Sequence, residues 1–256
     1  MKPMKIYDVH AHLMADLGGE PWHYCKPHIL RGEELYGISK FYISTIDGPA
    51  YYPDADVLTR CNDMTLDFMK ERPDLVRGMV YLNPKNENTL DELQRRVDEG
   101  FVGVKLWVSQ YCDDPSVYPL AERLIELDMP LLLHVFYKSI AQFPDETRAN
   151  HVRNLADRYP ELKIVMAHLG GDVYHAMRVI KDCPNVYVDN SGSRGGGPDM
   201  THAYKMVGAD RLLFGSDSPI DAAPALGQIL DLDIPEEEME KMLWKNAHKL
   251  FKEDLR

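Results

Sequence analysis

Two histidines two positions apart, close to the N-terminus, are the residues most suggestive of chemistry. His10 and His12 occur in the run IYDVHAH, which begins at Ile6. Alternate side chains of a β-strand point to the same face, so both imidazoles, and Asp8 before them, would project in one direction. Ring nitrogens on neighbours about 7 Å apart can converge on a metal ion at about 2 Å each. The spacing indicates a metal site, although a short polar strand that happens to carry two histidines is the alternative.

Four further residues able to ligate a metal or transfer a proton follow, each late in or just after an apolar run. They are Lys105 in GVKL, His134 in LLLHVF, His168 in IVMAHLGG and Asp217 in LLFGSDSP. Strand alternation puts His168 on the face of Ile164 and Met166, and Asp217 on the face of Leu213. One histidine at a strand end is more often a hydrogen-bonded structural residue. Five strands that each end in such a residue favour a shared site.

The elements that must position these residues alternate between strands and helices. We expect strands at 6–12, 41–45, 76–81, 102–108, 130–136, 163–168, 186–189 and 211–215. Apolar residues at helical spacing predict helices at 29–37, 55–71, 89–99, 117–127, 146–158, 173–181 and 200–207, and helical sequence with Pro235 at a helix start closes the chain.

This alternation predicts an α/β fold, a single (β/α)8 TIM barrel with parallel strands that forms one domain over residues 1–256. The alternative is an open doubly wound sheet, but the glycine-rich fingerprint that follows its first strand is missing. Active residues of a barrel lie at the C-terminal ends of the strands, because that rim carries the loops. The six residues above fall there.

The composition and net charge limit the classes of molecule that this protein is expected to bind. With 256 residues, 45% hydrophobic content and a formal net charge of −12, the chain can bury a full core, and it would repel nucleic acid or an anionic membrane surface. We expect a small-molecule partner. The four cysteines form no CxxC pair, the first strand leaves no room for a signal peptide, and no apolar run reaches about 20 residues, so the sequence predicts a cytoplasmic protein.

The motifs together resemble the amidohydrolase superfamily. An HxH on strand one, a lysine on strand four, histidines on strands five and six and an aspartate after strand eight match its metal-ligand layout. GVKL, AHLGG, VYVDNSG and GSDSP, with the terminal NAHKLF, are similar to its amidohydrolase-related (amidohydrolase 2) branch of small hydrolases, lactonases and non-oxidative decarboxylases. The resemblance extends from Asp8 to Phe251 and implies a TIM-barrel enzyme.

The resemblance also implies a ligand set. His10, His12, His134 and Asp217 would bind a first divalent metal, with zinc as the first choice and manganese as the alternative. Lys105 and His168 leave the number of ions open. In two-metal relatives the lysine is carboxylated and bridges the ions while the histidine binds the second. In one-metal relatives that histidine contacts substrate, and Lys105 would pair with a substrate carboxylate or simply face inward.

The leading functional hypothesis is hydrolysis of a small-molecule amide, ester or lactone by a metal-activated water. Asp217 would take the proton of that water and pass it to the leaving group, and His168 would hold a second ion or the developing oxyanion.

The alternative is non-oxidative decarboxylation of an aromatic or muconate-like carboxylic acid, with His168 or Asp217 managing the proton and Lys105 and Arg194 supplying positive charge. A metal-stabilised binding protein is a third hypothesis, but it predicts a lost ligand and none is lost. A homo-oligomer is the commoner state for such enzymes.

Overall fold

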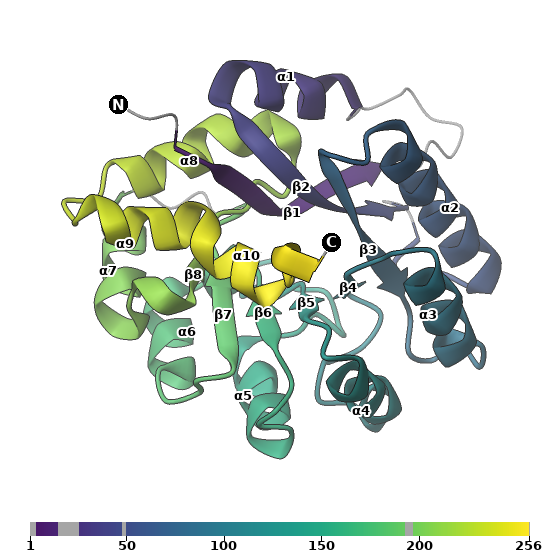
Figure 1. The fold of residues 1–256 in the computed structure, drawn as a ribbon. Coiled ribbons are helices and arrows are strands. Elements are labelled where there is room, and N and C mark those ends of the chain that lie inside the picture. Colours follow the sequence, from purple (N-terminus) through teal and green to yellow (C-terminus); the bar gives the residue numbers. More distant parts are fainter. Residues whose placement is uncertain (1–3, 15–25, 48–49, 193–196, 256) are drawn as a thin grey trace.

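Eight parallel strands form the centre of the molecule, and each pairs with the next along the chain. The structure, a computed structural model, describes residues 4–14, 26–47, 50–192 and 197–255. The strands are β1 (Ile6–Met14), β2 (Ile38–Ile46), β3 (Val76–Leu82), β4 (Gly103–Leu106), β5 (Leu131–Leu133), β6 (Ile164–Met166), β7 (Val186–Asp189) and β8 (Leu212–Leu213). Val9 N–H of β1 donates to the Phe214 carbonyl at 3.0 Å, so the segment that follows β8 is hydrogen-bonded to β1. The predicted (β/α)8 barrel is confirmed (Figure 1).

The helices surround this ring of strands (Figure 1). They are α1 (Lys26–Tyr36), α2 (Ala55–Glu71), α3 (Thr89–Asp98), α4 (Tyr118–Leu127), α5 (Ala149–Arg158), α6 (Val173–Ile180), α7 (Gly197–Val207), α8 (Ala222–Leu230), α9 (Glu236–Glu240) and α10 (Asn246–Leu250). The separate helix α8 was not predicted. No helix among the described residues is long and apolar enough to cross a membrane.

Several predicted elements are longer than the observed ones, and the differences lie at the functional rim. Strands expected at 130–136, 163–168 and 211–215 end at Leu133, Met166 and Leu213, and the helix expected from Glu146 begins at Ala149. Regular strand geometry is lost in the segments that follow β6 and β8, where the backbone is left-handed at His168, Leu169 and Asp217. The apolar runs themselves do not reveal this change.

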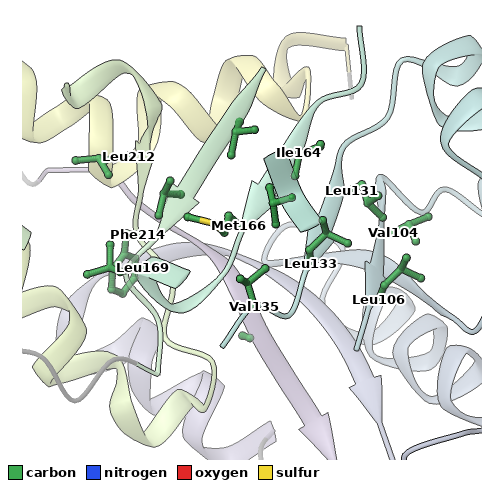
Figure 2. Packing of buried hydrophobic residues seen from close by; sticks show 14 of the residues in the cluster. Val104, Leu106, Leu131, Leu133, Val135, Ile164, Met166, Leu169, Leu212 and Phe214 are labelled. Atoms are coloured by element: carbon green, nitrogen blue, oxygen red, sulfur yellow. The ribbon is translucent and has the colours of Figure 1, made fainter. Parts of the chain in front are cut away.

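Outward-facing strand residues pack beneath the helices. Leu131, Leu133, Ile164 and Met166 belong to one large buried cluster, part of which is shown in Figure 2. Strands of an all-parallel sheet are covered on both faces, so their sequences read as continuous apolar runs rather than alternating ones. This explains the LLL of β5 and the IVM of β6.

A second buried cluster fills the interior of the barrel towards its base. Tyr7, Val9, Leu132, Val165 and Leu213 belong to it, together with residues of the chain's last helical segment: Ala247, Leu250 and Phe251. Figure 1 shows α10, in yellow, lying across the ring of strands. With this end closed by the C-terminal segment, only the opposite end is left for the candidate site.

Candidate metal centre

The two histidines of β1 face the mouth of the barrel because the strand contains an irregularity. Asp8 pairs with Phe41 of β2, whereas Ala11 pairs with Ile43, so three steps along β1 match two steps along β2. Such a bulge redirects side chains. His10 and His12 therefore lie in the site, as predicted.

Asp8 does not join the histidines at the site. Its carboxylate accepts hydrogen bonds from the His10 backbone N–H at 3.1 Å and from the Ser216 backbone N–H at 3.0 Å and hydroxyl at 2.6 Å. Burial raises its pKa to about 7. Asp8 therefore bonds β1 to the segment that follows β8, and the expectation that it projects in the same direction as the two imidazoles was wrong.

Three side-chain atoms converge in the mouth of the barrel. His10 Nε2 lies 3.0 Å from His12 Nε2, and Asp217 Oδ1 lies 3.4 Å from each nitrogen. Ligand atoms about 2.1 Å from one ion are about 3.0 Å apart at a right angle and about 3.4 Å apart at the tetrahedral angle. The spacing of these three atoms fits a divalent metal ion.

The outer nitrogens of the two rings support the same conclusion. His10 Nδ1 donates to Asp189 Oδ2 at 3.0 Å, and His12 Nδ1 donates to the Ser44 carbonyl at 3.1 Å. A neutral imidazole carries one N–H, so both Nε2 atoms present lone pairs. Two lone pairs that face each other at 3.0 Å require a cation or donor beside them, and besides a metal ion the Lys105 Nζ, 2.8 Å from His10 Nε2, can act as such a donor. Carboxylate and carbonyl partners of this kind commonly orient metal-binding histidines.

Charge states complete the fit. Burial, followed by the positive charge of Lys105, lowers the pKa of His12 to about 4 and that of His10 well below its usual value. Burial alone would raise the pKa of Asp217, but His168, His10, His12 and Lys105 together hold it well below its ordinary range. At neutral pH the site therefore offers neutral imidazoles and an ionised carboxylate, the donor set a divalent cation needs.

Lys105 reaches the same atoms from β4. Its Nζ lies 2.8 Å from His10 Nε2, and its side chain is fully buried. Burial lowers its pKa to about 8, against the opposing influence of Asp217 and Asp189. Lys105 therefore belongs to the site, and at neutral pH it brings a positive charge there.

Asp217 reaches its position through an unusual backbone conformation. Its φ is +64°, its N–H donates to the His10 carbonyl at 2.6 Å, and its own carbonyl accepts from His12 N–H at 3.1 Å. A regular continuation of β8 was expected to carry it. The left-handed turn does so instead.

His168 also enters the site through left-handed backbone, with φ +62° followed by +49° at Leu169. The prediction that it shares a strand face with Ile164 and Met166 was wrong, because those two side chains belong to the cluster under the helices. Ligand atoms of His168, His10 and Asp217 lie within 4.8 Å of one another. His168 therefore borders the triad formed by His10, His12 and Asp217.

His134 contacts His168 and lies further from the triad than His168 does. Its Nδ1 is 3.1 Å from His168 Nε2, and its Nε2 is 2.8 Å from Glu146 Oε1. Burial lowers its pKa to about 4. The structure thus brings together all six predicted residues, with His134 in contact with His168.

Sequence reasoning missed three residues that position the histidines. They are Asp189, Ser191 and Glu146. The signal for Asp189 was its place at the end of β7, the same rim position that identified the other residues. Arg194, considered as a charge for an acidic substrate, lies outside the described residues.

A glycine allows the loop after β7 to approach the site closely. Gly192 has φ +52°, and a Cβ there would lie 2.8 Å from His168 Nδ1 and 2.9 Å from Asp217 Oδ2. A side chain at this position would collide with both. His168 and Asp217 therefore both pack directly against the backbone of Gly192.

The fold and this site define an enzyme of the amidohydrolase superfamily. The chain belongs to the family described as Amidohydrolase, whose model matches residues 7–252. Among individual proteins, it is similar to the gamma-resorcylate decarboxylase of Polaromonas sp. The two sequences are 28% identical over an alignment of 276 residues, which covers 85% of this chain and 84% of that protein.

Solved structures share the fold. A 2,6-dihydroxybenzoate decarboxylase from Rhizobium is 23% identical with a TM-score of 0.78, covering 99% of this chain and 100% of that one. A dihydroxybenzoic acid decarboxylase from Polaromonas sp., with bound manganese and the inhibitor 2-nitroresorcinol, is 22% identical with a TM-score of 0.79, covering 99% and 98%.

These comparisons correct the main functional prediction. Hydrolysis is overturned because the relative that is similar in sequence, at 28% identity, is a decarboxylase, and decarboxylation was the stated alternative. The predicted divalent metal is supported, while zinc in particular is not: the metal named with a solved relative is manganese.

Proposed function

We propose that this protein is a metal-dependent, non-oxidative decarboxylase of a hydroxylated aromatic acid of the dihydroxybenzoate class. The observation that carries the proposal is the convergence of two imidazole lone pairs, one ionised carboxylate and a buried lysine at the mouth of the barrel. Similarity to gamma-resorcylate decarboxylase supports the reaction class.

The residues divide into two groups in this proposal. His10, His12 and Asp217 hold the metal, with His168 and His134 beside them. Manganese is the ion we favour because a solved relative carries it. When bound, the ion supplies a positive charge for substrate oxygens. The Lys105 ammonium adds a second positive charge, which suits an anionic substrate. No observation supports a carboxylated Lys105, so we propose a single ion.

The reaction replaces the carbon–carboxylate bond by a carbon–hydrogen bond. One proton reaches the ring carbon, the electron pair of the broken bond is retained on the ring, and carbon dioxide leaves. We assign His168 and Asp217 to hold that proton, since their ligand atoms and that of His10 lie within 4.8 Å of one another. No oxidant or reductant is needed.

The test is direct. Protein supplied with Mn²⁺ is incubated with 2,6-dihydroxybenzoate, and carbon dioxide and resorcinol are measured. We expect equimolar release, loss of activity after chelation, and a decrease in kcat of about 10³-fold for Asp217→Asn with the fold retained. Lack of carbon dioxide from a panel of hydroxybenzoates, or an unimpaired Asp217→Asn variant, would refute the proposal.

A further inference from the structure

Glu146 is a buried carboxylate in the loop between β5 and α5. Its side chain is fully shielded from solvent, although the sequence placed it at the start of a helix. Besides His134, its donors are Lys138 Nζ at 2.7 and 3.0 Å, Gln142 Nε2 at 2.5 Å and the Phe143 N–H at 3.3 Å. An ionised carboxylate at such a depth needs partners of this number.

The contact between Glu146 and His134 fixes which nitrogen of the ring carries the proton. An ionised carboxylate can only accept, so His134 Nε2 must be the donor at 2.8 Å. A neutral imidazole has one N–H, and Nδ1 is therefore left as a lone pair. That lone pair faces His168 Nε2 at 3.1 Å.

The next ring is oriented by a different partner. His168 Nδ1 donates to the Ser191 carbonyl at 3.0 Å, and the Ser191 hydroxyl donates to Asp189. The direction set by Glu146 therefore ends at His134, whose Nδ1 lone pair faces the His168 ring.

We propose that Glu146 is a positioning residue, which fixes the tautomer of His134 so that its Nδ1 lone pair faces the site beside His168. Glu146 does so while it also closes the loop, because Lys138 and Gln142 of that loop bind the same carboxylate. The effect on catalysis rests on the proposed function. The tautomer does not.

The alternative is that Glu146 only holds the loop, and Glu146→Gln separates the two roles. The atom Oε2 receives Gln142, the Phe143 N–H and the longer of the two Lys138 contacts, so the new amide oxygen would take this position, and the 2.7 Å contact of Lys138 with Oε1 would be lost. The amide NH₂ then faces His134 Nε2 and donates to it. His134 would be forced into the opposite tautomer, with N–H on Nδ1, in a side chain of nearly unchanged size.

The measurement is NMR of ¹⁵N-labelled histidine, in protein without metal and in protein loaded with diamagnetic Zn²⁺, alongside kcat and KM with Mn²⁺. We expect Nε2–H for His134 in the unaltered protein, Nδ1–H in Glu146→Gln, and a decrease in kcat of about 10- to 100-fold with little change in KM. Gln142→Met is the matched control. This variant removes another donor to the same carboxylate and leaves the contact with His134 in place. The tautomer of His134 should therefore be unchanged, and kcat should stay within about two-fold of the unaltered protein.

An Nδ1–H tautomer in the unaltered protein would overturn the proposal without any variant. Equal losses of kcat in Glu146→Gln and Gln142→Met, with both tautomers unchanged, would also overturn it and leave only a loop role. Failure of the unaltered protein to release carbon dioxide would count against the proposed function, while the NMR result would still decide the tautomer.

Discussion

The hydrogen bond made by the outer ring nitrogen determines what each histidine of this site offers. His10 and His12 donate from Nδ1 to a carboxylate and a carbonyl, so their Nε2 lone pairs converge. His134 donates from Nε2 to Glu146, so its Nδ1 faces the site instead. Identical residue types thereby reach the site with different atoms, and the partners that decide this come from distant parts of the chain.

Metal content tests the assignment at this scale. We expect about one ion per chain in protein purified without chelators or a histidine tag, because the three converging atoms describe one position. His10→Ala should lose the ion, since it removes one of those atoms. Lys105→Met should keep the ion, because the lysine is not among the three ligands.

Elemental analysis of the unaltered protein, His10→Ala and Lys105→Met measures the number of ions per chain. Two ions per chain that fall with Lys105→Met would support a bridging lysine and contradict a single site. Circular dichroism of each variant serves as the control for folding.

At the scale of elements, α2 completes a sheet that the strands leave open. β2 and β3 pair only from Phe41 to Ile43, and the polar side chains of α2 fill the gap beyond. Asn62 accepts from Tyr81 N–H at 2.8 Å and donates to the Tyr81 carbonyl at 3.1 Å. Thr65 Oγ1 accepts from Thr45 N–H at 3.0 Å. The helix therefore supplies hydrogen bonds that a neighbouring strand would otherwise make.

Asn62→Ala should consequently destabilise the barrel. It leaves both peptide groups of Tyr81 buried without a partner, which costs about 3 kcal/mol of unfolding free energy. Urea unfolding followed by circular dichroism measures the loss. Asn88→Ala is the control, because Asn88 is exposed and makes no side-chain cap hydrogen bond, and its effect should be under about 0.5 kcal/mol. Similar values for the two variants would contradict the role of Asn62.

At the scale of the whole molecule, the two ends of the barrel have different tasks. The C-terminal ends of the strands carry the site, and the chain's own C-terminal segment closes the base. Glu253 receives Arg77 Nε at 3.0 Å and the Tyr42 hydroxyl at 3.0 Å, and it pairs with Lys40 Nζ at 3.2 Å. The last segment is thereby attached to β2 and β3.

This attachment predicts a pH-dependent contribution to stability. Burial alone would raise the pKa of Glu253, but the hydrogen bonds and charge of Arg77, with Lys40 and Tyr42, hold it below the ordinary value of 4.5. A carboxyl whose pKa is lower in the folded state stabilises the fold above its unfolded pKa, and that contribution is lost as the pH falls through the folded pKa. Glu253→Gln should therefore cost about 2 kcal/mol at pH 7, and less as the pH falls below about 4.

Unfolding free energies at pH 7, 5 and 3.5 check the expected trend. Asp254→Asn is the matched control, because Asp254 is an exposed neighbour that contacts only His248 among the described side chains. A difference between Glu253→Gln and the unaltered protein that stays constant over this pH range would argue against the ion-pair explanation.

The sequence by itself determined the barrel and the rim. Apolar runs that alternate with helical spacing leave few arrangements other than parallel strands covered by helices, and ligating residues at strand ends must then meet at one edge. Strand alternation was also enough to place His10 and His12 together, since two residues on one strand need no tertiary contact to share a face.

The tertiary structure alone decided how the other residues enter the site. His168 and Asp217 depend on left-handed backbone after the strands end, which the apolar runs do not encode. Glu146 and Asp189 act through histidines 12 and 179 residues away in sequence, so no local pattern reveals which histidine each carboxylate contacts. Local sequence fixes the period and direction of an element, whereas the partner of each ring nitrogen depends on which distant segments the closed barrel brings into contact.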